Sequence, residues 1–311
     1  GLPRPEIITD GTALVLAYGL FRQDILKKEE EQHHQQQKKA NEGNEADGSS
    51  ETSGSHNILF LDFGHSAAQA TVACFDAAGA RVAAHEWTWA AAGSVLDDAL
   101  FGHFAAELAG RGVDVGEGNP RAGARLRAAC HRLKKTLSAN AEASVTVECL
   151  DGDTDCHLRL TRDAFERKLD EAGAGEAVLS LCWRALAAAG LSVHDLAAVE
   201  LVGGSSYVPY LCRAAAAAVA ACDTDPGGPG SQRSPPPVRR SLNAGEALAR
   251  GAALAAAAAS PLLQIRKYKV EDCCSPAQAV TFRWKGEGID GTGELVVKAG
   301  TCLPFEAEFE A

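Results

Sequence analysis

The sequence contains no methionine, few aromatic residues (6%) and no long apolar run. Its longest apolar stretches, residues 214–222 and 252–259, are rich in alanine and fall well below the roughly 18 residues that span a bilayer. Residues 1–26 also lack the basic, apolar and small-residue order of a signal peptide. We therefore expect no membrane partner. The absence of an initiator methionine ahead of Gly1 leads us to expect further sequence upstream.

Basic charge is also scarce, because 30 lysines and arginines stand against 41 aspartates and glutamates, which gives a net charge of −11. A nucleic-acid partner is therefore disfavoured, since proteins that bind duplexes carry a basic face. The ten cysteines show no C-x-x-C pair or other metal-binding spacing, and no N-x-S/T glycosylation acceptor occurs. Reduced thiols and a cytoplasmic location, in the cytosol or the nucleus, fit this pattern best.

Strand and helix patterns alternate along the 311 residues, which are enough for about two domains and indicate an α/β fold. Two polar stretches interrupt the pattern. Residues 27–56 are predicted to be a disordered low-complexity insertion, and residues 222–237, rich in Pro and Gly, a loop insertion. The predicted strands are 57–63, 67–76, 81–89 (these three an antiparallel meander), 144–150, 157–160 and 197–202, and the predicted helices are 12–26, 95–111, 121–137, 177–189, 209 onward and 243–259.

The first candidate site motif is Asp62 at the end of the first strand of the meander, followed by the turn Gly64-His65-Ser66. A carboxylate in this position can hold a hydrated Mg²⁺, and the turn can present backbone N–H groups to a phosphate. Strands that end in Asp and Gly are common, so this motif alone is equally well explained as an ordinary turn.

The second motif is the polar side of the helix predicted over about 121–138, on which His131, Lys134, Lys135 and Ser138 follow one another at helical spacing. A basic stripe beside an apolar one can bind an anion or lay an alkyl stem along a purine ring. An ordinary solvated basic face is the alternative.

The third motif is Gly203-Gly204-Ser205, which lies between a predicted strand and a predicted helix. Glycine lets the backbone approach a ligand closely, and a helix N-terminus favours negative or polar groups. Glycine pairs also occur in many turns without a ligand.

Taken together, the order and spacing of these motifs resemble the nucleotide-binding domain of the 70-kDa heat-shock chaperone superfamily, and most of all its large 110-kDa branch, whose members act as nucleotide exchange factors. A GHSA turn stands where ordinary 70-kDa chaperones have GGGT. The segments that carry the resemblance are GTALVLAYGLFRQD (11–24), NILFLDFGHSAAQATVACFD (57–76), CHRLKKTLSANA (130–141), VELVGGSSYVP (199–209) and SLNAGEALARGAALAAAAASP (241–261).

The resemblance implies an actin-like, ribonuclease-H-like ATPase fold of two lobes around a nucleotide cleft. It covers nearly all of the chain outside the two insertions. The implied units are a remnant of nucleotide-binding lobe one (1–26), lobe two (57–262, with an upper subdomain at about 92–170), an interdomain linker (263–270) and the start of the substrate-binding β-sandwich (271–311).

The resemblance also implies a site for ATP or ADP with Mg²⁺. Asp62 would face the Mg²⁺ through water, and Gly64, His65 and Ser66 match the second phosphate loop. Lys134, Lys135 and Ser138 match the residues that contact adenine and ribose. Gly203, Gly204 and Ser205 match the adenosine loop.

Several positions depart from the pattern of the family. Tyr207 stands where an arginine normally lies against the adenine, and His131 stands where an acidic residue normally accepts from the ribose. Gln69 replaces a magnesium-side carboxylate, Gly245 replaces an aspartate near the base, and Asp10 replaces a glutamate. A lost acceptor on a buried hydroxyl costs about 1–3 kcal/mol, so we expect nucleotide binding to be weak or lost.

No residue of this chain is expected to be catalytic, because the family's first phosphate loop and catalytic lysine belong to lobe one. Phosphoryl transfer depends on groups placed around the phosphates. The preferred hypothesis is a chaperone or co-chaperone that binds a 70-kDa chaperone, assists nucleotide exchange and meets unfolded client proteins. The alternatives are an ATP-dependent folding chaperone, if lobe one exists natively, and an inert remnant. An actin-fold sugar kinase is less favoured, because no aspartate lies in a sugar-binding context.

Overall fold

The computed structural model describes residues 7–22, 55–76, 79–151, 154–222, 235–263, 268–273, 278–286, 289–297 and 301–303. Nearly all of the insertion predicted at 27–56, most of the one at 222–237, and residues 264–267 of the predicted linker lie outside these ranges. In the described part, no helix is both long enough and apolar enough to cross a membrane.

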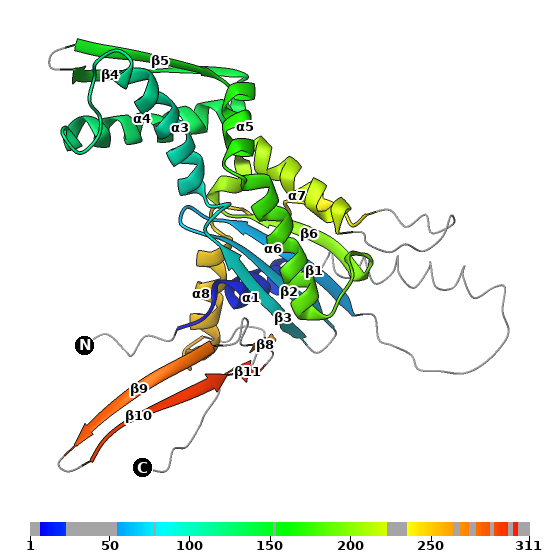
Figure 1. The fold of residues 1–311 in the computed structure, drawn as a ribbon. Helices are drawn as coiled ribbons and strands as arrows, with labels where there is room; N and C mark the ends of the chain where they lie inside the picture. The colour runs from blue at the N-terminus through cyan, green and yellow to red at the C-terminus, as the bar shows by residue number, and fades with distance from the viewer. Residues whose placement is uncertain are drawn as a thin grey trace, which may run out of the picture.

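A seven-stranded mixed sheet forms the centre of the molecule (Figure 1), in the order β11-β8-β3-β2-β1-β6-β7. The predicted meander is confirmed, because β1 pairs antiparallel with β2, and β2 pairs antiparallel with β3. β6 runs parallel to β1 on its other side. The strands are β1 (His56–Phe63), β2 (Ala68–Phe75), β3 (Gly79–Thr88), β6 (Leu196–Val202), β7 (Val238–Arg239), β8 (Lys269–Cys273) and β11 (Cys302–Leu303).

Helices cover both faces of this sheet, which explains why β1 reads as a near-continuous apolar run. Leu59, Leu61 and Phe63 join a core cluster with the helices α6 and α7, whereas Ile58 and Phe60 join a second cluster with α1. In Figure 1, α1 and α8 lie together on one side of the strands. The helices are α1 (Asp10–Phe21), α6 (Ala174–Ala189), α7 (Pro209–Ala221) and α8 (Ala247–Ala259).

The contact between α1 and α8 depends on Gly251, because a Cβ at this position would overlap the backbone carbonyl of Ala13. Two helices can approach this closely only where one of them has no side chain at the crossing point. This close approach places the second core cluster, with Leu14 and Tyr18 of α1, directly under the sheet.

A smaller unit of helices and one hairpin lies beyond one end of the sheet (Figure 1). The helix predicted over 121–137 is confirmed, and its apolar residues at helical spacing, Leu126, Cys130, Leu133 and Leu137, are all buried in the core. The elements of this unit are α3 (Gly93–Ala109), α4 (Pro120–Ala139), β4 (Glu142–Asp151), β5 (Thr154–Thr161) and α5 (Arg162–Glu171).

The C-terminal strands differ in part from the separate β-domain that the sequence predicts from residue 271. β8 pairs parallel with β3, and β11 pairs with β8, so both extend the central sheet. Cys273 is buried in the second core cluster, and the hydroxyl of Tyr268 donates to the carbonyl of Gly79 at 3.2 Å. These contacts favour the pairing of β8 with the edge of β3 over a separate β-domain. The strands β9 (Gln278–Gly286) and β10 (Ile289–Val297) form a hairpin of their own.

Candidate functional site

The candidate site lies where the parallel strands β1 and β6 end at the same edge of the sheet. Asp62 is paired in register with Val202, so the turn after β1 and the loop after β6 begin side by side. Ligands of α/β sheets commonly bind at the carboxyl ends of adjacent parallel strands. The short 3-10 turn η2 (Gly204–Tyr207) follows β6 directly.

The Asp62 side chain is buried, with 3% of its surface exposed, and its Oδ1 atom has no hydrogen-bond partner. Burial, with a smaller contribution from the charge of Asp10, raises the pKa of Asp62 to about 6. On the neighbouring strand, Gln69 lies opposite Asp62 and donates from Nε2 to Oδ2 of Asp10 at 2.8 Å. Gln69 therefore positions Asp10 instead of adding a second carboxylate beside Asp62.

The turn after β1 is held by two backbone hydrogen bonds and by one from a side-chain hydroxyl. The N–H of Gly64 donates to the carbonyl of Ala67 at 3.0 Å, and the N–H of Gly93, at the start of α3, donates to the carbonyl of Gly64 at 2.9 Å. The hydroxyl of Ser205, in η2, donates to that same carbonyl at 3.3 Å. The side chains of His65 and Ser66 are exposed. The structure thus joins the predicted phosphate turn, the predicted adenosine loop and α3.

The polar residues of α4 separate into an inward-facing and an outward-facing group. Lys134 is 5% exposed, and its Nζ donates to Oδ2 of Asp97 at 2.8 Å and to the carbonyl of Gly93 at 2.9 Å. Asp97 Oδ2 also lies 3.3 Å from Nδ1 of His131 and 3.9 Å from Nδ1 of His65. Asp97, on α3, is therefore the carboxylate around which the predicted residues gather.

Lys135 and Ser138 do not share in this cluster. Lys135 is exposed, and the hydroxyl of Ser138 donates to the carbonyl of Lys134 within α4, at 2.9 Å. A side chain bonded to its own helix in this way orients only itself.

Tyr207 is 53% exposed, and the guanidinium of Arg240 lies over its ring, with Cζ 5.5 Å from the ring centre. Such a contact between a cation and an aromatic face contributes about 0.5–1 kcal/mol at exposed sites. Arg240 also donates to the carbonyl of Ser206. The sequence analysis did not identify Arg240 or Asp97 as site residues. For Arg240 a signal exists, because the pair Arg239-Arg240 lies just ahead of the segment 241–261.

The family model described as "Hsp70 protein" matches residues 1–287, which is most of the chain. The chain belongs to the Hsp70 family. The actin-like ATPase fold implied by the sequence is that of this family, and the mixed α/β architecture agrees with it. Hsp70-family proteins bind ATP and ADP, in general with Mg²⁺.

Curated relatives match almost the whole chain at modest identity. Heat shock 70 kDa protein 16 of Arabidopsis thaliana is 33% identical over 306 residues, which cover 98% of this chain and 34% of the relative. A heat shock protein homolog of Saccharomyces cerevisiae is 29% identical over 305 residues (98% and 38%). Heat shock 70 kDa protein 4L of Homo sapiens is 28% identical over 299 residues (96% and 30%). The chain thus spans about a third of the length of these relatives.

The residues at the strand ends fit one side of an Hsp70-type nucleotide site. Asp62 offers a buried carboxylate with one unpartnered oxygen, and a Cβ at Gly203 would fill the space beside it. Mg²⁺ accepts few protein ligands and keeps several waters, so Asp62 would hold the ion through water. The bound ion would supply charge neutralisation at the phosphates, and Gly64 and Ser205 would shape the backbone around them.

The raised pKa of Asp62 predicts a stability that depends on pH. The folded state holds this proton more tightly than the unfolded chain, so stability falls as pH rises from about 4 to about 6 and stays level above that. Asp62→Asn is therefore expected to increase the free energy of unfolding by up to about 3 kcal/mol at about pH 8, with little effect near pH 4. Urea unfolding of both proteins across this range measures the difference. An equal effect at both ends of the range would contradict the prediction.

Proposed function

We propose that this Hsp70-family chain is a co-chaperone of the 110-kDa type, which binds a 70-kDa chaperone and accelerates release of its nucleotide. Its own adenine-nucleotide binding is weak in this proposal, and it acts as a binding partner and not as an ATPase. Unfolded clients are a further class of partner, and the cytoplasm is the proposed location.

The observation that carries the proposal is the burial of Lys134 and the hydrogen bonds that its ammonium group makes. In a site that depends on its nucleotide, we expect the basic group to face the ligand. Here the Lys134 ammonium is buried and already satisfied by Asp97 and by the carbonyl of Gly93. The contact between α3 and α4 is therefore complete without a nucleotide, which suits a lobe that must keep its shape while it binds another protein.

Two departures from the family pattern support the same proposal. His131 stands where the family has an acidic residue, and it lies against Asp97. Position 131 therefore offers no carboxylate to accept a hydrogen bond from a ribose hydroxyl. Tyr207 takes the position of an arginine, and the nearby cation, Arg240, is occupied by the tyrosine ring and by the carbonyl of Ser206. Each loss is expected to reduce affinity for adenosine.

The test is the release of a fluorescent ADP analogue from a purified 70-kDa chaperone, followed by stopped-flow fluorescence. Adding this chain is expected to accelerate release at least about tenfold, in proportion to its concentration up to saturation. The same chain unfolded by heat serves as the control. An unchanged release rate, together with no complex in a pull-down at micromolar concentration, would refute the exchange function.

A second candidate, an ATP-dependent folding chaperone, is favoured by the unpartnered Oδ1 of Asp62 at the strand ends. Titration of the chain with the same ADP analogue and Mg²⁺ distinguishes the two candidates. Saturable binding in the low micromolar range would favour the folding chaperone, and binding weaker than about 0.1 mM agrees with the co-chaperone. A chain that neither binds nucleotide nor accelerates its release would be an inert remnant.

A further inference from the structure

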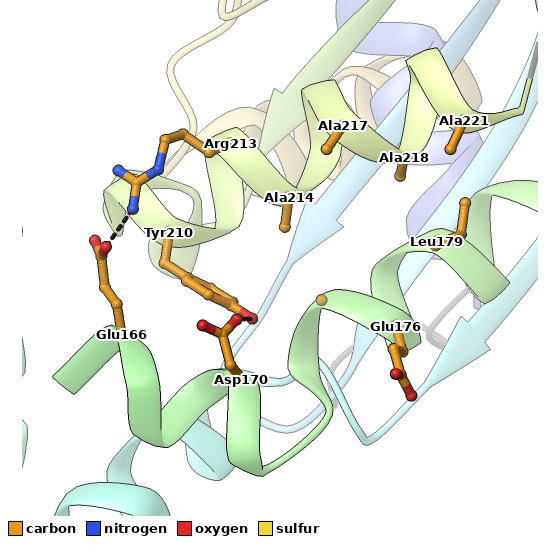
Figure 2. Close-up of a pocket in the computed structure, with 11 residues that line it drawn as sticks. Glu166, Asp170, Glu176, Leu179, Tyr210, Arg213, Ala214, Ala217, Ala218 and Ala221 are labelled. Atoms are coloured by element: carbon orange, nitrogen blue, oxygen red, sulfur yellow. Dashed lines mark hydrogen bonds and ion pairs between the residues drawn. The ribbon is translucent and has the colours of Figure 1, made fainter. Parts of the chain in front are cut away.

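A groove of about 500 Å³ runs between α6 and α7, with α5 at one end (Figure 2). Its apolar wall is a ridge of alanines on α7, and Leu179 of α6 lies on the opposite side. Leu179 is 37% exposed, and Trp183, one turn further along the same side of α6, is 58% exposed. The alanines of the ridge, spaced at helical intervals, are Ala214, Ala217, Ala218 and Ala221.

The polar end of the groove is negatively charged, because three carboxylates and one guanidinium line it. Arg213 is paired with Glu166, and the hydroxyl of Tyr210 donates to Oδ1 of Asp170 at 2.7 Å (Figure 2). Glu176 lies on the rim, exposed, and forms no ion pair with another described residue. The Oε1 atom of Glu166 is buried and has no hydrogen-bond partner. Glu176 is therefore the carboxylate of the groove that is left for an incoming cation.

We propose that this groove binds an amphipathic helix of a partner protein, with small and aliphatic residues on one face and lysine or arginine at its edge. A ridge of alanines lets a second helix approach closely, so that its side chains pack on either side of the ridge. From Ala214 to Ala221 the ridge is about 10 Å long, which matches two turns of a helix. Leu179 supplies a larger apolar contact inside the groove, and the exposed Trp183 lies just beyond it on α6. Exposed aromatic residues are frequent anchors of such interfaces.

Because the groove is negatively charged, its occupant is expected to be a basic segment of another protein and not a second copy of this chain. The described helix with the most lysine and arginine is α4, and its apolar stripe, which includes Leu126 and Leu133, is buried in its own core. A second copy therefore cannot present α4 to the groove without unfolding. This inference is independent of nucleotide exchange, because the groove shares no residue with the site at the ends of β1 and β6.

The probe is a fluorescein-labelled model peptide of about 14 residues, with leucine and alanine on one helical face and lysine on the other. Fluorescence anisotropy with the full chain is expected to give saturable binding. Ala217→Phe, which fills the groove, is expected to weaken binding at least about tenfold. Ala216→Phe is the matched control, because Ala216 is exposed on the same helix but does not line the groove, and it is expected to leave binding unchanged.

A second pair of variants tests the charge. Glu176→Lys is expected to weaken binding several-fold, with a smaller effect at high salt because exposed charges are screened. Glu117→Lys makes the same change on the loop before α4 and is expected to have little effect. Melting curves verify that all four variants are folded. Equal weakening by Ala216→Phe and Ala217→Phe, or equal affinity for a peptide with glutamate in place of lysine, would overturn the proposal.

Discussion

Gly203→Ala is expected to lower the free energy of unfolding by about 3 to 5 kcal/mol. Gly203 has φ 84° and ψ 151°, a region that residues with a Cβ almost never adopt, at a cost of about 1–3 kcal/mol. The added Cβ would lie 2.5 Å from the carbonyl oxygen of Phe63 and would overlap the Asp62 carboxylate. Crowding in a packed region costs a further 1–3 kcal/mol or so.

The backbone at Phe63 cannot easily move aside, because β1 is paired on both sides, with β2 and with β6. Gly204→Ala is the matched control: a Cβ at Gly204 would have no heavy atom within 4 Å, and its backbone needs no glycine. The control is expected to change stability by less than about 0.5 kcal/mol. Urea unfolding measures both variants, and similar losses in the two would contradict the assigned conformation of this loop.

The sequence predicted the elements whose patterns are local. The meander follows from apolar runs separated by short turns, and the helix 121–137 follows from its regular stripe. The helix α5 was missed, although Thr161 caps its N-terminus and Phe165 and Leu169 have helical spacing. For the predicted helix 12–26, the structure has α1 from Asp10 to Phe21, and residues 23–26 lie outside the described ranges.

Long-range pairing was harder to predict. The addition of β8 to the edge of β3 depends on tertiary contacts, such as those of Thr9 and Thr12, whose hydroxyls both donate to Oδ2 of Asp272, at 2.8 and 2.5 Å. The β-sandwich start predicted at 271–311 implies strands without saying which sheet they join.

The candidate site could be predicted in its backbone and only partly in its side chains. Because β1 and β6 are parallel neighbours, Asp62 and Gly203 meet at one edge, as the resemblance implies. Asp97 and Arg240 belong to no motif, and their importance comes from partners on other elements. Such pairings depend on the packing of one helix against another, which a local pattern does not contain.

Lys134→Met is expected to lower the free energy of unfolding by about 2 to 3 kcal/mol, because it leaves the part-buried carboxylate of Asp97, whose side chain is 15% exposed, without its closest cation. Methionine keeps most of the apolar stem of lysine, so the loss reports the charge. Lys135→Met is the matched control on the same helix. Lys135 is exposed, so its replacement is expected to change stability by less than about 0.5 kcal/mol.

The double variant Lys134→Met/Asp97→Leu measures how strongly Lys134 and Asp97 stabilise each other. When both charges are removed, neither is left buried alone, so the double variant is expected to recover about 2 kcal/mol relative to the sum of the two single losses. Urea unfolding of the wild type and the three variants gives this coupling energy. Strictly additive losses would show that Lys134 and Asp97 act separately.

The same variants relate the stability of the lobe to its candidate site. Lys134 donates to the carbonyl of Gly93. The N–H of Gly93 in turn donates to the carbonyl of Gly64, in the predicted phosphate turn. If this chain of contacts positions the turn, Lys134→Met weakens the binding of the fluorescent ADP analogue even at temperatures where the variant is fully folded. The double variant, which regains stability but not the contact with Gly93, is expected to remain weak in binding. Recovery of both properties together would mean that the pair supports the fold alone.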